Sequence, residues 1–241
     1  MVLIVLSLAS CSKVETVRDV AVQFDATVSP EMTVLVKSGE AQAEPVLANH
    51  AVLQAWRGDV KAAEVVQEIP PATTQISFSG VKLAGGAEYT VYIWVDCEGY
   101  YNTSDLRSVS VTKNYDGKSA GFDAFYSCST VRCGQDDEVH NVTLKRPFAK
   151  VSFRAQVNSQ LKVKFTAPTT LNLKTGEVSG TRNVEYTVQP AESSVTAFDY
   201  IFATEDVSQL AYTFILGEEE KTTSVPVKRN TKTNIIYNTT N

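Results

Sequence analysis

The clearest pattern in the chain lies between Arg146 and Val157, where apolar and polar side chains alternate. The apolar side chains fall at every second position: Ala149, Val151, Phe153, Ala155 and Val157. This period of two predicts a half-buried strand, because successive side chains on a strand point to opposite faces. Pro147 has no backbone N–H for a ladder, so it suits an edge or the first residue of a strand. We therefore predict that this run opens a second domain.

Short runs rich in β-branched and aromatic residues recur on both sides of Arg146. Those before it are 17–24, 32–37, 51–56, 75–79, 89–95, 109–112 and 142–145. Those after it are 161–165, 171–180, 185–188, 198–202, 212–216, 222–228 and 233–237. Two hairpins are expected, one turning at Thr175-Gly176 and one across 217–220. Many short strands with turn signals between them predict β-sandwiches instead of a βαβ fold.

Two segments depart from simple alternation. Residues 59–69 contain Ala, Glu and Val in an order that fits either a short helix or a strand, and Pro70-Pro71 ends the segment. Residues 89–95 are apolar or aromatic at nearly every position. Such a run is typical of a central strand that is buried on both faces.

Composition and charge narrow the class of protein. The chain has 241 residues, of which 43% are hydrophobic and 20% are charged, as in ordinary globular proteins. Its formal net charge of -5 argues against nucleic acid as a partner, because nucleic acids select basic surfaces. Catalytic motifs are absent from the sequence, so we expect a protein that is not an enzyme.

The first eleven residues indicate export. Residues Val2 to Ala9 are almost all apolar, yet too few to span a bilayer, which needs about 20. We interpret 1–10 as a signal peptide. Its end, Leu8-Ala9-Ser10-Cys11, resembles a bacterial lipobox, in which the Cys11 thiol carries the lipid. The alternative is an ordinary apolar region with an incidental cysteine.

Four features together resemble the fimbrillin-like lipoproteins of Bacteroidales, the subunits of type V pili. They are the lipobox at Cys11, Leu144-Lys-Arg-Pro-Phe-Ala-Lys-Val151, Leu173-Lys-Thr-Gly-Glu-Val178 and Val225-Pro-Val-Lys-Arg-Asn-Thr-Lys-Thr-Asn-Ile235. Each is short, so their order along the chain provides the specificity. The resemblance implies two transthyretin-like β-sandwich domains in tandem, which we place at 11–145 and 146–241.

The same resemblance implies an outer-membrane lipoprotein, palmitoylated at Cys11, whose partners are other fimbrial subunits. Subunits of this family assemble by adding a strand to a sheet edge. Polymerising members first lose a strand to a protease that cuts after a basic residue. Arg18 is the nearest basic candidate after Lys13, and it precedes the end of the first expected strand. We therefore expect a structural, anchor or tip subunit of a fimbrium.

A surface glycan-binding lipoprotein is the alternative function. Tyr100, Tyr101 and Asn102 follow the predicted central strand, and tyrosine rings in a loop can stack on a sugar. The competing interpretation is that paired tyrosines at a strand end cover a core. Host glycans or host proteins are further candidate partners.

The remaining cysteines and the histidines suggest a disulfide more than a metal site. Cys128 and Cys133 are a candidate disulfide in an envelope compartment, and Cys97 with Cys128 is an open alternative. The spacing of Cys128, Cys133, Asp136 and His140 fits no standard zinc pattern, so neither a metal nor a cofactor is expected. Arg57-Gly58-Asp59 matches a cell-adhesion tripeptide, but a given tripeptide recurs by chance, so we interpret it as a turn between strands.

Overall fold

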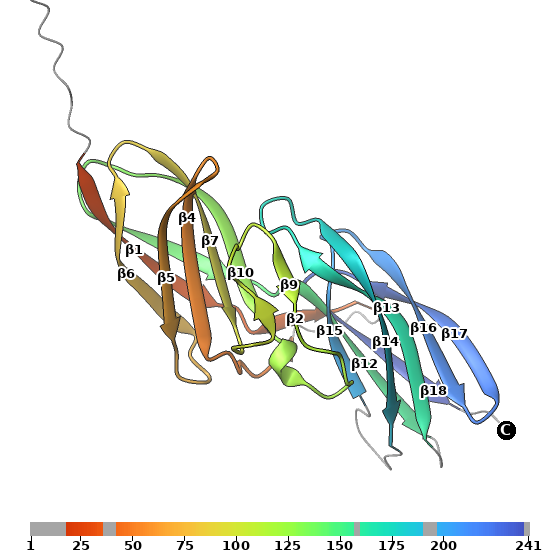
Figure 1. The fold of residues 1–241 in the computed structure, drawn as a ribbon. Coiled ribbons are helices and arrows are strands. Elements are labelled where there is room, and N and C mark those ends of the chain that lie inside the picture. Colours follow the sequence, from red (N-terminus) through yellow and green to blue (C-terminus); the bar gives the residue numbers. More distant parts are fainter. Residues whose placement is uncertain (1–17, 36–41, 157–159, 190–196, 239–241) are drawn as a thin grey trace, which may run out of the picture.

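The computed structural model describes residues 18–35, 42–156, 160–189 and 197–238. In these ranges every regular element is a β-strand, except for one 3-10 helix at Ala120–Phe122. The strands form two sandwiches that lie end to end (Figure 1). The prediction of an all-β fold is confirmed. No helix in the described ranges is long and apolar enough to cross a membrane.

The first sandwich contains a sheet of three strands facing a sheet of four. The three-stranded sheet has the order β11 (Glu138–Leu144), β1 (Asp19–Val28) and β6 (Gln75–Ala84). The other has the order β10 (Phe125–Arg132), β7 (Glu88–Asp96), β4 (His50–Arg57) and β5 (Val60–Glu68). Strand β1 pairs parallel with β11 and antiparallel with β6. Its apolar residues meet those of β4 and β7 in one core cluster that includes Phe24, Leu53 and Ile93.

The second sandwich is built around β12 and β13. One sheet has the order β15 (Ala197–Phe202), β12 (Phe148–Gln156), β18 (Thr231–Asn238), β2 (Glu31–Val34) and β3 (Gln42–Ala43). The other has the order β17 (Glu219–Val227), β16 (Ser208–Leu216), β13 (Leu161–Leu171), β9 (Val109–Val111) and β8 (Tyr101–Asn102). Strand β14 (Val178–Val188) also pairs with β13.

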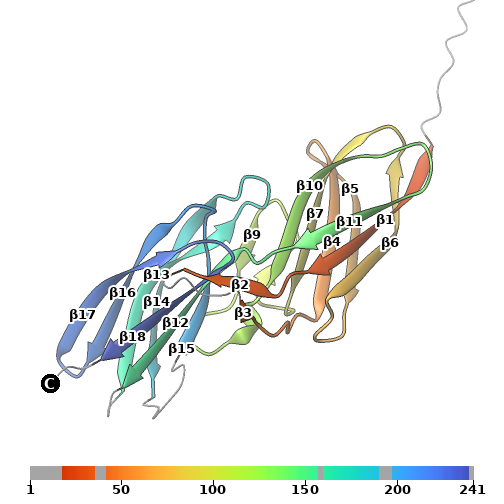
Figure 2. The same ribbon diagram turned by 180° about the vertical axis from the view of Figure 1, so that it is seen from behind.

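Four strands that precede Arg146 in the sequence belong to the sheets of the second sandwich: β2, β3, β8 and β9. Figure 2 shows β2 leaving the end of β1 and lying beside β18. Met32 and Val109 are buried in the larger core cluster, with residues of β12 and β13. The chain thus crosses between the sandwiches several times. A domain boundary between Lys145 and Arg146 stays a prediction.

Strand β12 differs from its prediction. The alternation predicted one exposed face, but every residue from Phe148 to Ser152 is buried. The strand lies between β15 and β18, and both faces of the sheet are covered there. Lys150 is 8% exposed, and its Nζ lies 2.7 Å from Glu44 Oε2 and over the rings of two aromatic residues, Phe198 and Tyr200. A polar side chain at an alternate position can therefore be buried when a partner is folded over it.

The other strand predictions are settled by the pairing. Residues 60–68 form β5, an edge strand whose side chains are mostly exposed, and not a helix. Strand β7 is an inner strand, and its residues from Val91 to Asp96 are all buried, as predicted. Both predicted hairpins are confirmed, because Leu171 faces Val178 and Leu216 faces Glu219.

Candidate functional site

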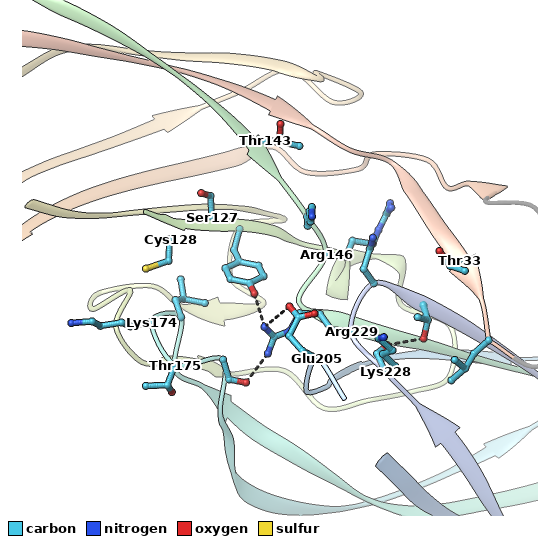
Figure 3. A pocket seen from close by; sticks show the side chains of 17 residues that line it. Thr33, Ser127, Cys128, Thr143, Arg146, Lys174, Thr175, Glu205, Lys228 and Arg229 are labelled. Carbon is cyan, nitrogen blue, oxygen red and sulfur yellow. Dashed lines mark hydrogen bonds and ion pairs between the residues drawn. The ribbon is translucent and has the colours of Figure 1, made fainter. Parts of the chain in front are cut away.

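A cleft of about 700 Å³ opens where the two sandwiches meet (Figure 3). Residues from β10, from the end of β11, from the β13–β14 turn and from the segment before β18 line it. This volume lies within the range of roughly 300–1,000 Å³ that is usual for small-molecule sites. Three of the short motifs seen in the sequence meet here, through Arg146, Gly176 and Arg229.

Arg229 is the centre of the cleft. It is 5% exposed, and its Nε–H donates to the carbonyl oxygen of Ala203 at 3.0 Å. Nη1 donates to the Tyr126 hydroxyl at 2.6 Å, and Nη2 donates to the carbonyl oxygen of Gly176 at 2.6 Å. Glu205 Oε1 lies 3.2 Å from Nη1. These bonds fasten β10 of the first sandwich to the β13–β14 turn of the second.

Both the β13–β14 turn and the close approach of the Arg229 guanidinium require a glycine at position 176. Its φ is +74°, a conformation that side chains with a Cβ rarely adopt. A Cβ at this position would also lie 2.9 Å from Arg229 Nη1. The Thr175-Gly176 turn predicted from the sequence is therefore also the place where the guanidinium is held.

Arg146 supports the floor of the cleft. Its side chain is fully buried, and Nε and Nη2 donate to the two carboxylate oxygens of Asp123 at 2.7 and 2.8 Å. Nη1 donates to the carbonyl oxygen of Pro30, and the guanidinium lies 4.5 Å from the ring centroid of Phe125. Burial raises the pKa of Asp123, and the neighbouring Arg146 opposes that shift. The pair ties the β1–β2 crossing to β10 and to the start of β12.

The cleft carries a surplus of positive charge. Its lining includes Lys145, Lys174 and Lys228, and across the described ranges none of the three forms an ion pair with a carboxylate. Glu205 is the one acidic residue among the described lining residues, and it is paired with Arg229. Five serine and threonine side chains also line the walls: Thr33, Ser127, Thr143, Thr175 and Thr231. Such a lining suits a polar, negatively charged ligand.

The change Tyr126→Phe is expected to lower the free energy of unfolding by about 1–2 kcal/mol. It removes the hydroxyl that accepts from Arg229, and Nη1 of this buried guanidinium then keeps Glu205 as its partner but loses the shorter of its two hydrogen bonds. Urea unfolding measures the loss. Tyr115→Phe is the control, because its buried hydroxyl has no partner among the described residues. An equal loss in both variants would contradict this role of Tyr126.

The predicted ligand loop turns mostly inward. Tyr101 is 6% exposed, its hydroxyl donates to the carbonyl oxygen of Phe122 at 2.5 Å, and its ring packs on Trp94. The half-buried ring of Tyr100 meets the ring of Phe122 edge-on, with 4.9 Å between centroids. Asn102 is exposed, and its Oδ1 accepts from the backbone N–H of Ser104. The two tyrosines thus cover a core, as the competing interpretation held, and do not form a stacking platform.

The structure does not bring the predicted disulfide partners together. Cys128 lies on β10 and Cys133 follows the end of the same strand. Five residues of extended chain span roughly 16 Å, whereas bridged cysteines have Cα atoms within about 7 Å. Among the described residues, Cys97, Cys128 and Cys133 form no disulfide. In the described ranges, no group of three or more His, Cys, Asp and Glu side chains is placed to hold a metal ion.

These thiols are expected to react slowly with iodoacetamide in the native protein. Burial raises the pKa of Cys97 and of Cys133 to about 11, and it also raises the pKa of Cys128. Because the thiolate is the nucleophile, little reactive form is present at pH 8. Mass spectrometry of alkylated protein, with and without urea, tests this. Rapid alkylation without urea would contradict it.

Two other features from the sequence have simple outcomes. Cys11 lies outside the described residues, so its lipidation stays a prediction. Arg57-Gly58-Asp59 forms the tip of the β4–β5 hairpin, where Arg57 pairs with Val60 and Gly58 has a φ of +58°.

The cleft itself was not predicted, although Lys145-Arg146, Lys174 and Lys228-Arg229 were visible as basic residues in three separate motifs.

The sequence model of DUF6562, a family of unknown function, matches residues 15–238. The chain belongs to the DUF6562 family. Comparison with curated proteins gives no match for it.

Solved structures resemble this DUF6562 protein over most of its length. The fimbrial anchor protein Mfa2 from Porphyromonas gingivalis has a TM-score of 0.54 at 12% identity, over 80% of this chain and 77% of that chain. A candidate cell adhesion protein from Parabacteroides distasonis has a TM-score of 0.54 at 10% identity, over 90% and 88%. A candidate polysaccharide-binding protein from Bacteroides thetaiotaomicron has a TM-score of 0.58 at 9% identity, over 84% and 78%. At these identities the likeness shows the fold, a β-sandwich architecture found in Bacteroidales fimbrial and adhesion proteins.

Proposed function

We propose that this DUF6562 protein is a cell-surface fimbrial or adhesion subunit, attached to the outer membrane through a lipid on Cys11. The observation that carries the proposal is the fold shared with Mfa2, a fimbrial anchor protein, over 80% of the chain. Its role is then structural and adhesive, and its main binding partners are other fimbrial subunits. Strand addition at a sheet edge is the mode of assembly that the architecture supports.

Strand β1 supports an anchor or tip role over that of a cleaved stalk subunit. It is an inner strand, bonded to β6 on one side and to β11 on the other. Arg18 directly precedes its first residue, Asp19. A cut after Arg18 would therefore leave β1 whole and open no groove between β6 and β11.

Immunogold labelling of intact cells tests the proposal. We expect antigen on the surface, at the ends or bases of filaments, and acylated Cys11 in protein taken from membranes. Label along whole filaments would favour a stalk subunit. Protein that is found only inside the cell, with an unmodified Cys11, would overturn the proposal.

Glycan binding is the second candidate function. Its support comes from the polar, positively charged cleft and not from the loop at Tyr100 and Tyr101. The burial of Tyr101 removes one of the two tyrosine rings that were predicted from the sequence to stack on a sugar. A glycan array compares Tyr100→Ala with the unchanged protein. We expect any saturable binding to survive this change.

A further inference from the structure

We propose that the cleft between the sandwiches binds an acidic saccharide, whose carboxylate or sulfate groups are held by Lys145, Lys174 and Lys228. This inference builds on the second candidate function, glycan binding, and it does not depend on fimbrial assembly. It begins from charge: a chain of net charge -5 gathers around one cleft three lysines that form no ion pair within the described part of the chain. Such a local excess attracts anions and is strongest at low salt.

The three lysines come from separate elements whose backbones are fixed. Lys145 exchanges two backbone hydrogen bonds with Tyr126, at 2.9 and 3.1 Å. The backbone N–H of Lys174 donates to Asn172 Oδ1 at 2.9 Å, and the carbonyl oxygen of Lys228 accepts from Thr231 Oγ1 at 2.7 Å. Figure 3 shows Lys174 and Lys228 on opposite sides of Arg229. The ammonium groups are thus carried by flexible side chains whose backbones are fixed around a buried guanidinium.

The rest of the lining favours a sugar over a peptide. Hydroxyl side chains line the walls, whereas Leu35 and Leu173 are the aliphatic residues in the described lining. Peptides without clustered acidic or phosphorylated residues are usually held in apolar grooves or as an added strand. Saccharides present many hydroxyl groups and match hydroxyl and ammonium donors. The volume of about 700 Å³ accommodates a short oligosaccharide segment.

A change at Glu205 is expected to raise the affinity for an acidic saccharide, whereas changes at the lysines lower it. Its carboxylate is exposed, and it lies 3.2 Å from Arg229 Nη1 at the cleft. The change Glu205→Gln removes the one negative charge in the described lining and weakens the hold on the Arg229 guanidinium. Affinity for an acidic saccharide is expected to rise severalfold. A merely structural role for the lysines and Glu205 would not predict this gain.

The experiment is isothermal titration calorimetry on the purified protein at low salt. The probes are trigalacturonate, a chondroitin sulfate tetrasaccharide, neutral maltotriose and hexaglutamate. We expect saturable binding of at least one acidic saccharide and none of maltotriose. The triple variant Lys145→Gln, Lys174→Gln, Lys228→Gln is expected to weaken that binding at least tenfold. The triple control Lys82→Gln, Lys113→Gln, Lys118→Gln removes the same charge from exposed sites elsewhere. We expect it to change the affinity for the acidic saccharide less than twofold.

The outcomes separate the alternatives. Failure of both acidic saccharides to bind, or equal binding of maltotriose, overturns the inference. So does an equal loss in the two triple variants, because the attraction would then be nonspecific. Tighter binding of hexaglutamate than of either saccharide assigns the cleft to an acidic peptide and also overturns it. Circular dichroism confirms that each variant is folded, and the location of the protein on filaments has no bearing on the result.

Discussion

Replacing Arg146 with methionine is expected to lower the free energy of unfolding by about 3–5 kcal/mol, the usual cost of removing one member of a buried ion pair. The side chain is fully buried, and it forms two hydrogen bonds to Asp123 at 2.7 and 2.8 Å. Without the guanidinium, the Asp123 carboxylate is left in a site that is 1% exposed. The carbonyl oxygen of Pro30 also loses its donor.

Urea unfolding followed by tryptophan fluorescence measures this loss. Arg132→Met is the matched control, because Arg132 is exposed at the end of β10. The double change Arg146→Met with Asp123→Leu removes both charges, and it should recover much of the lost stability. A loss below about 1 kcal/mol in the single variant would show that the pair contributes little more than a surface ion pair does.

Raising the pH from about 4 to about 7 is expected to remove up to about 4 kcal/mol of stability through a single carboxyl group, Asp199. Asp199 is 2% exposed on β15, and it accepts a hydrogen bond of 2.5 Å from the Tyr186 hydroxyl. Burial raises its pKa from 3.8 to about 7, which the bond from Tyr186 opposes. Between these two values the unfolded chain has lost the proton while the folded protein keeps it.

The sign follows from this difference in bound protons. The folded state binds more protons than the unfolded state between pH 4 and 7, so the free energy of unfolding falls as the pH rises. Above pH 7 both states are ionised, and the loss from this group is complete. The change Asp199→Asn removes the titrating group while keeping its shape.

Urea unfolding at pH 4.5 and at pH 8 compares Asp199→Asn with the unchanged protein. We expect the stability difference between the two proteins to shift in favour of the variant by a few kcal/mol at the higher pH. Asp206→Asn, at an exposed position, should show no such shift. Other titrating groups, such as His50 beside Asp96, contribute equally to both proteins and cancel in the comparison. Parallel pH profiles for Asp199→Asn and the unchanged protein would contradict the prediction.

Much of the fold could be predicted because its signals are local. The alternation in 75–79 predicts a strand with one buried face, and the continuous apolar run in 89–95 predicts a strand that is buried on both faces. Each pattern lies within one short stretch of sequence. The turn at Thr175-Gly176 depends on a positive φ that glycine supplies by itself. Segment 59–69 was harder, because its alanine and glutamate residues carry helix preference, and pairing with β4 overrode it.

The sequence by itself thus determined the class of the fold, most of its strands, both hairpins and the resemblance to Bacteroidales fimbrial proteins. Tertiary structure decided which sandwich β2 and β9 join and that Tyr101 faces inward. It also brought Arg146, Gly176 and Arg229 to one cleft. The reason is physical: strand formation depends on neighbours within a few residues, whereas these outcomes depend on contacts between segments that are tens to more than a hundred residues apart, which no local pattern records.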